Sequence, residues 1–209
     1  EFRRVLFRSV TYDNSAVTNN PILYVNGVKY SVGDGLTEQA TPVGTRTTDV
    51  GTDLTIGGGV GSDGTTDGNI LNAQLYDHVL TTKERNELYA NFLASTQIGQ
   101  PKRGFSLDKP KDLSDEVGLV AGYNMTLDED GTVSDLSGNG NDGTNNGCLP
   151  SEDGLVFNGV DSKVSISNDS SIQSAAKTIN IRFISQDNTK GIIVKGISRT
   201  VGRDWEVFE

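Results

Sequence analysis

The chain has few of the residues that usually build reactive or cross-linked sites. Its 209 residues include one cysteine, Cys148, and one histidine, His78. A single cysteine excludes an intrachain disulfide framework and a zinc site made of several cysteines. No apolar run reaches the roughly 20 residues of a membrane-spanning helix, so we expect no membrane span. Acidic residues outnumber basic ones to give a net charge of −10. That charge argues against a nucleic-acid partner, because phosphate binding requires clustered cations.

Turn-forming residues are abundant. The chain contains 25 glycines together with many Asn, Asp, Ser and Thr residues, which favour tight turns. Short apolar runs recur between these turns at a spacing of about 8–12 residues, as in antiparallel sandwiches. The hydrophobic fraction of 34% suits sheets that each bury one face. We therefore predict an all-β, antiparallel two-sheet sandwich.

Two local patterns predict specific elements. Asn26-Gly27 lies between apolar runs at residues 22–25 and 28–32, and this dipeptide is the strongest short hairpin signal because both of its residues tolerate positive φ. One short helix is expected at about residues 81–94. A capping-box pattern opens it, and an apolar stripe follows that can lie on a sheet. The residues of the cap and the stripe are Thr81, Glu84, Leu88, Tyr89, Phe92 and Leu93.

The chain falls into four segments. Residues 1–9, EFRRVLFRS, place three arginines in an acidic chain and back-translate to a common short-read sequencing adapter. We interpret them as a translated assembly scar outside the fold; the alternative is a genuine amphipathic start. Residues 96–116 carry two prolines and mixed charge with little periodicity, which is typical of a linker. Residues 10–95 and 117–209 remain as two halves.

Each half carries motifs that resemble the LamG-like, concanavalin A-like family. Three motifs are similar to the last third of such a domain: LYVNG (23–27), LTIGGG (54–59) and NILNAQLYDHVLTTKERNELY (69–89). Three others are similar to the first third: GLVAGYNM (118–125), VSDLSGNGNDGT (133–144) and GLVFNGVDSKVSIS (154–167). The resemblance implies a jelly roll of two antiparallel sheets.

The order of these motifs is reversed relative to the family. Residues 10–95 resemble the closing part of a domain, and residues 117–209 resemble an opening part. The chain is therefore either a window across two tandem domains or a circular permutant. We expect the two halves to pack face to face as a partial, permuted jelly roll, because each half has strands with one apolar face. Few contacts between the halves would instead indicate a window across two tandem domains.

The resemblance covers lectins, adhesion modules and some glucanases, so the fold does not settle function. Glucanases of this fold need closely spaced carboxylates to flank the scissile bond, and the alternating Glu-x-Asp-x-Glu pattern is absent from the chain. We therefore expect that this protein is not an enzyme. We predict a non-enzymatic binding or structural module of an extracellular or virion surface protein, such as a phage tail, that contacts carbohydrate or a surface protein. The alternative is an accessory carbohydrate-binding domain of a polysaccharide-degrading enzyme.

The best candidate for a metal site is the loop DLSGNGND (135–142). Asp135, Asn139, Asn141 and Asp142 place four hard oxygen ligands in a glycine-rich segment, and calcium prefers such ligands. We predict structural calcium bound with a dissociation constant on the order of 10⁻⁴–10⁻³ M. The alternative is a turn without a metal, in which the Asn and Asp residues only adopt positive φ and form hydrogen bonds from side chain to backbone.

Overall fold

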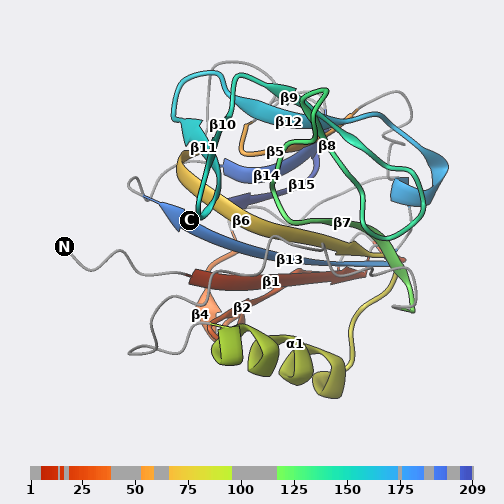
Figure 1. Ribbon diagram of the computed structural model, residues 1–209. Coiled ribbons are helices and arrows are strands. Elements are labelled where there is room, and N and C mark those ends of the chain that lie inside the picture. The colour runs from red at the N-terminus through yellow and green to blue at the C-terminus, as the bar shows by residue number, and fades with distance from the viewer. Residues whose placement is uncertain are drawn as a thin grey trace.

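The chain is mostly β-structure arranged in two sheets. The computed structural model describes residues 6–13, 15–16, 19–38, 53–58, 66–95, 117–173, 176–185, 191–196 and 203–208. Within these residues the two sheets lie one above the other, and a single α-helix lies outside the larger sheet (Figure 1). This confirms the prediction of an all-β, two-sheet architecture with one short helix.

The larger sheet has nine strands, in the order β10-β11-β6-β13-β1-β2-β3-β4, with β7 also paired to β6. Their bounds are β1 Leu6–Asp13, β2 Ile22–Val25, β3 Val28–Val32, β4 Gly35–Leu36, β6 Asp67–Tyr76, β7 Leu119–Tyr123, β10 Leu149–Ser151, β11 Gly154–Asn158 and β13 Ala176–Ser185. Its strand pairs are antiparallel except for β3 with β4.

The smaller sheet has six strands, in the order β15-β14-β5-β12-β9-β8, and all its pairs are antiparallel. Their bounds are β5 Leu54–Ile56, β8 Thr132–Val133, β9 Gly143–Asn146, β12 Lys163–Ile166, β14 Gly191–Gly196 and β15 Arg203–Phe208. A short 3-10 helix, η1 (Ser170–Gln173), connects β12 toward β13.

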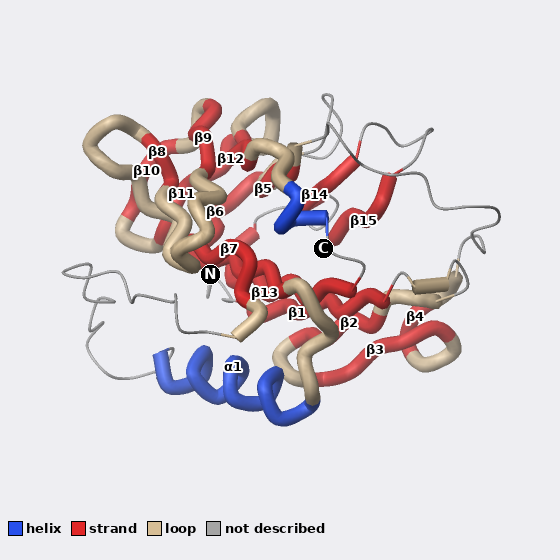
Figure 2. Tube along the Cα trace, turned by 90° about the vertical axis from the view of Figure 1, so that its right-hand side faces the viewer, coloured by secondary structure: helices blue, strands red, loops and turns tan. Residues whose placement is uncertain are grey.

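The main core lies between the two sheets. Alternate residues of each strand point to one face of a sheet, and the inward-facing ones are the apolar ones. The larger sheet contributes Ile179, Ile181 and Phe183 from β13. The smaller sheet contributes Ile56 from β5 and Ile166 from β12, both fully buried. The opposite face of the larger sheet is covered in part by α1 (Figure 2).

Strands from both halves are interleaved within both sheets. β6 of the first half pairs with β13, β11 and β7 of the second, and β5 pairs with β12 and β14. The expectation that each half forms its own layer and packs face to face on the other is therefore wrong. The physical reason is that the strands of one half alone would leave rows of unpaired N–H and C=O groups at their edges. The window alternative predicted few contacts between the halves, which this pairing contradicts.

The first strand begins earlier than the sequence indicated. β1 starts at Leu6, and its residues 6–9 pair with residues 180–183 of β13. Phe7 is buried, and its ring lies 5.8 Å from that of Tyr89 and 5.3 Å from that of Phe92. Setting residues 1–9 outside the fold was thus wrong for residues 6–9, because pairing and aromatic contacts place them in the sheet. The predicted linker at 96–116 lies outside the described residues.

Both local predictions are confirmed. The Asn26-Gly27 turn has φ values of 49° and 81° and joins β2 to β3, with Val25 opposite Val28. Positive φ at both turn residues is the geometry of a type I′ hairpin. The helix α1 spans Thr82–Ser95. Within the described residues no helix has the length and apolar character needed to cross a bilayer.

Candidate functional site: a polar hollow at the loop end

The predicted cation loop folds around the carboxylate of Asp135. One carboxylate oxygen accepts hydrogen bonds from the backbone N–H groups of Gly122 and Ser137, both at 2.9 Å. The other accepts from the Ser137 hydroxyl at 2.8 Å and from the Asn141 N–H at 3.0 Å. Four donors therefore surround this side chain, and they tie the loop to β7.

The two amide side chains of the loop also bond to β7. Asn139 donates to the carbonyls of Leu119 and Val120, at 2.9 and 3.1 Å. Asn141, which is 6% exposed, donates to the Val120 carbonyl at 2.9 Å. Asp142 accepts from the backbone N–H of Asp135 at 2.8 Å. These bonds are those of the hydrogen-bonded turn that was the alternative to a cation site.

The aromatic ring beneath this loop belongs to Tyr123. Its hydroxyl donates to the carbonyl of Asn141. Burial raises the pKa of Tyr123, and the charges of Asp135 and Asp142 raise it further. The phenol is thus held in its neutral form and acts as a fixed donor. Among the described residues no group of three His, Cys, Asp or Glu side chains is placed to hold a metal, and calcium binding stays a prediction.

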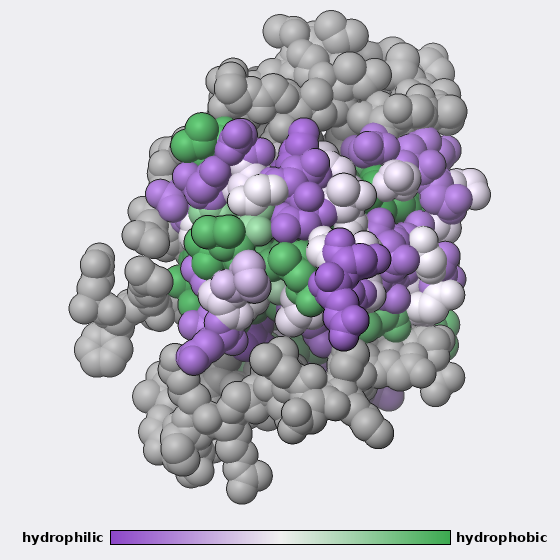
Figure 3. Space-filling view, turned by 45° about the horizontal axis from the view of Figure 1, so that its top comes forward, coloured by the Kyte–Doolittle hydropathy of each residue, from purple (hydrophilic) through white to green (hydrophobic). Residues whose placement is uncertain are grey.

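An open hollow of about 250 Å³ lies beside the loop. Its lining comes from two separate loops, the one before β9 and the one after β12: Asn139, Gly140, Asn141, Asp142, Ser167, Asn168 and Asp169. We call this feature the loop-end hollow. All of its side chains are amides, carboxylates or a hydroxyl. The coloured part of the face shown in Figure 3 is largely hydrophilic, with apolar areas between the polar residues.

The second wall of the hollow is also held by hydrogen bonds. The Asn168 N–H donates to Asp53 at 3.1 Å, and its side-chain oxygen accepts from Gln173 at 3.3 Å. Asp169 accepts from the backbone N–H of Ser171 at 2.8 Å, and this bond lowers the pKa of Asp169. Asp169 therefore stays ionised at neutral pH. The sequence flagged only the first wall, because the second reaches the hollow through the pairing of β9 with β12.

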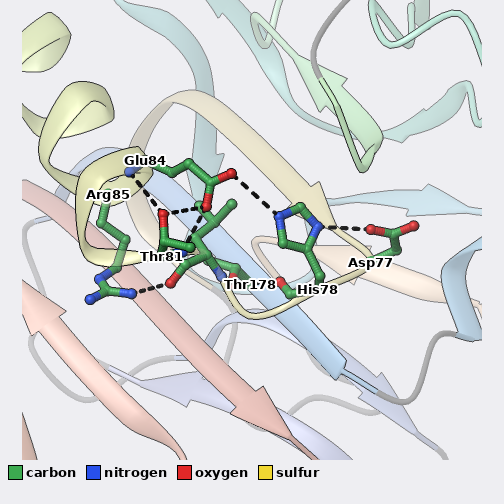
Figure 4. Close-up of polar contacts among 7 residues, drawn as sticks. Asp77, His78, Thr81, Glu84, Arg85 and Thr178 are labelled. Atoms are coloured by element: carbon green, nitrogen blue, oxygen red, sulfur yellow. Dashed lines mark hydrogen bonds and ion pairs between the residues drawn. The ribbon is translucent and has the colours of Figure 1, made fainter.

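A second polar cluster surrounds His78 at the junction of β6 and α1 (Figure 4). The ring nitrogens lie 2.9 Å from Asp77 and 3.9 Å from Glu84. Thr178 of β13 donates to the His78 carbonyl at 2.8 Å and accepts from the Leu80 N–H at 2.9 Å. The cluster therefore anchors the start of the helix to the larger sheet.

The capping box at the same junction is formed as predicted. Glu84 accepts from the Thr81 backbone N–H and from its hydroxyl, both at 2.7 Å, and the Glu84 N–H reaches the Thr81 hydroxyl at 3.3 Å. The Thr81 hydroxyl, the largest cause, lowers the pKa of Glu84. Arg85 donates to the Leu80 carbonyl and to the Thr82 hydroxyl. These bonds satisfy groups that a helix start leaves exposed.

The surroundings of the only cysteine make its thiol unreactive. Cys148 is buried, and burial raises the pKa of its thiol to about 12. Its backbone groups bond to the side chain of Asn145 at 2.9 and 3.0 Å. A thiol with so high a pKa carries almost no thiolate at neutral pH and is unreactive.

No protein-family model, curated protein or solved structure matches this chain. The resemblance to the LamG-like family therefore depends on the motifs in the sequence, and the assignment of function depends on the geometry of the hollow.

Proposed function

We propose that this protein is a non-catalytic binding or structural module of the LamG-like type, and that it contacts carbohydrate or a surface protein through the loop-end hollow. The observation that carries the proposal is the convergence of two loops on one open hollow whose side chains are polar throughout. Sites of this kind use a few fixed polar groups to orient a ligand.

The chemistry of the lining favours a hydroxyl-rich ligand. A sugar hydroxyl can donate and accept at once. Carboxylates such as Asp142 and Asp169 accept, and so does the side-chain oxygen of Asn139, whose NH2 group already donates to β7. The amide of Asn168 carries both functions. Two carboxylates in the lining disfavour an anionic ligand. Neutral carbohydrate is therefore the ligand class that this hollow supports best.

The rigidity of the loops supports the same conclusion. Asp135 and the amide groups of Asn139 and Asn141 bind the first loop to β7, and Asn168 and Asp169 are held by their own hydrogen bonds. A preorganised surface loses less entropy when it binds a ligand. Location on an extracellular or virion surface is part of the proposal, since such surfaces present carbohydrate ligands and partners.

A glycan array with a blocked hollow tests the proposal. Ser167 is exposed and lines the hollow, whereas Ser170 is exposed three residues further on and does not line it. We expect the wild type and Ser170→Tyr to bind the same neutral glycans and Ser167→Tyr to lose them. Equal binding by both variants would place the contact elsewhere, and release of sugar from a polysaccharide would contradict a non-catalytic role.

Structural calcium is proposed at the same loop, with Asp142 as the carboxylate that also faces the hollow. Asp135 already accepts four hydrogen bonds, so its contribution to a cation would compete with them. Calorimetric titration with calcium should give weak heats for the wild type that are lost in Asp135→Ala plus Asp142→Ala. Equal heats for both proteins, or no heat from either, would leave the loop as a hydrogen-bonded turn.

A further inference from the structure

A second polar region lies on the opposite side of the larger sheet, beneath α1. In β13, Ile179 and Ile181 belong to the main core, so Thr178 and Asn180 point to the other face. In β1, Ser9 is opposite Asn180 and Thr11 is opposite Thr178. We call these four residues the α1 seam; all are at most 3% exposed.

The helix covers the Ser9–Asn180 row of this seam. Ser9 is opposite Tyr24 of β2, and the guanidinium of Arg85 lies 4.3 Å from the centre of the Tyr24 ring. One step further along β1, Phe7 packs against Tyr89 and Phe92. Contacts with α1 thus occur at the Ser9 row and at the row next to it, and they close the seam from above.

Three side-chain polar atoms within the seam have no hydrogen-bond partner among the described residues. They are the hydroxyl of Ser9 and both polar atoms of the Asn180 amide, and each residue is 1% exposed. Buried polar groups are nearly always paired, since each unpaired group costs stability. Thr178, in the next row, shows the usual situation: its hydroxyl bonds to His78 and Leu80.

A hollow lies beside the neighbouring row of the seam. This hollow, of about 220 Å³, is lined by Thr11, Asp13, Asn19, Asn20, Ile22 and Val79. Thr11 lies two residues from Ser9 on the same face of β1. The hollow therefore touches the seam at Thr11, in the row next to Ser9 and Asn180, and its lining combines polar groups with two apolar side chains.

We infer that the α1 seam is a binding site for a small neutral molecule that presents a hydrogen-bond donor beside an acceptor, as an amide group does, and that Ser9 and Asn180 hold it. The Asn180 amide offers one donor group and one acceptor side by side, so another amide complements it with two antiparallel hydrogen bonds. The Ser9 hydroxyl supplies a third bond. A neutral ligand is favoured because Asp13 lines the mouth and the chain carries a net charge of −10.

Three probe molecules of the same size separate the possibilities. Acetamide is neutral and both donates and accepts, acetone can only accept, and acetate is anionic. In two-dimensional NMR spectra we expect acetamide to shift the side-chain amide signals of Asn180 in a saturable manner, and acetone and acetate to have much smaller effects. Ser9→Ala should weaken acetamide binding by about tenfold, the effect of losing one well-placed hydrogen bond.

The stability of variants provides an independent readout. Asn180→Leu removes a buried amide that bonds to no described group, so its Tm should equal or exceed that of the wild type. Thr178→Val is the matched control on the same strand and face, and it should lower the Tm because two hydrogen bonds are lost. The inference is overturned if Asn180→Leu lowers the Tm as much as Thr178→Val. It is equally overturned if acetate shifts the Asn180 signals more than acetamide does, or if no probe shifts them.

Discussion

The loop-end hollow and the α1 seam both bury polar side chains, but they differ in how many of these side chains form hydrogen bonds. In the loop before β9, Asp135 accepts four hydrogen bonds, and Asn141 bonds to β7. In the seam, Ser9 and Asn180 are more deeply buried and have no partner among the described residues. In the first region hydrogen bonds hold the polar groups, whereas in the second they hold Thr178, and aromatic contacts lie beside the row of Ser9 and Asn180.

The difference follows from how each region is assembled. The loop closes over a short stretch of sequence, so its side chains can reach backbone groups of the neighbouring β7. The seam joins β1 to β13, which are more than 160 residues apart in the chain. There, strand alternation alone decides which side chains meet. Variants in the loop should therefore change stability through lost hydrogen bonds, and variants around the seam through lost aromatic packing.

The largest effect is expected at the aromatic contacts that hold α1 over the seam. Phe7→Ala removes a ring that packs on Tyr89 and Phe92, and it should lower the free energy of unfolding by about 3–5 kcal/mol. Urea unfolding measures this change. Leu93→Ala is the control, since Leu93 is 49% exposed on the same helix and should have little effect. An unchanged stability of Phe7→Ala would mean that residues 6–9 do not belong to the sheet.

A smaller loss is expected in the loop. Asp135→Ala leaves four donors without their acceptor, three of them the backbone N–H groups of Gly122, Ser137 and Asn141, and should cost about 2–3 kcal/mol. Glu129→Ala is the control, because Glu129 is exposed in the preceding turn. A stability equal to that of the control would show that the hydrogen bonds of Asp135 do not hold the loop.

The smallest effect concerns pH at the start of α1. The folded-state pKa of Glu84 is lowered by the Thr81 hydroxyl. Its contribution to stability is therefore present above the unfolded pKa of a glutamate, about 4.3, and is lost as pH falls through the lower folded value. Glu84→Gln should flatten this acid limb slightly in unfolding curves recorded between neutral and acidic pH. An acid limb that is identical in the two proteins would contradict the role of the capping box.

Local chemistry made part of the fold predictable. Asn26-Gly27 specifies a hairpin because both turn residues adopt positive φ, and Thr81 with Glu84 specifies a helix start through bonds within one turn. Neither depends on distant parts of the chain. For the same reason, the turn alternative for the loop at Asp135 was available from the sequence.

Long-range pairing could not be predicted in the same way. The sequence of β6 does not indicate that it pairs with β13, about 100 residues later, instead of with strands of its own half. Residues 6–9, Leu-Phe-Arg-Ser, look foreign to an acidic chain and show no apolar–polar alternation, yet all four pair with β13 and the last two also pair with β2. The second wall of the hollow, at Ser167 and Asp169, was missed because only the pairing of β12 brings it close.

The interleaving of the two halves in both sheets is the central structural claim, and it requires a single cooperative unit. The chain contains one tryptophan, Trp205 in β15 of the smaller sheet, and one histidine, His78, next to β6 of the larger sheet. Urea unfolding followed by Trp205 fluorescence and by the NMR signals of His78 should give the same midpoint and slope. Two separate transitions would show that the halves fold independently and would contradict a shared pair of sheets.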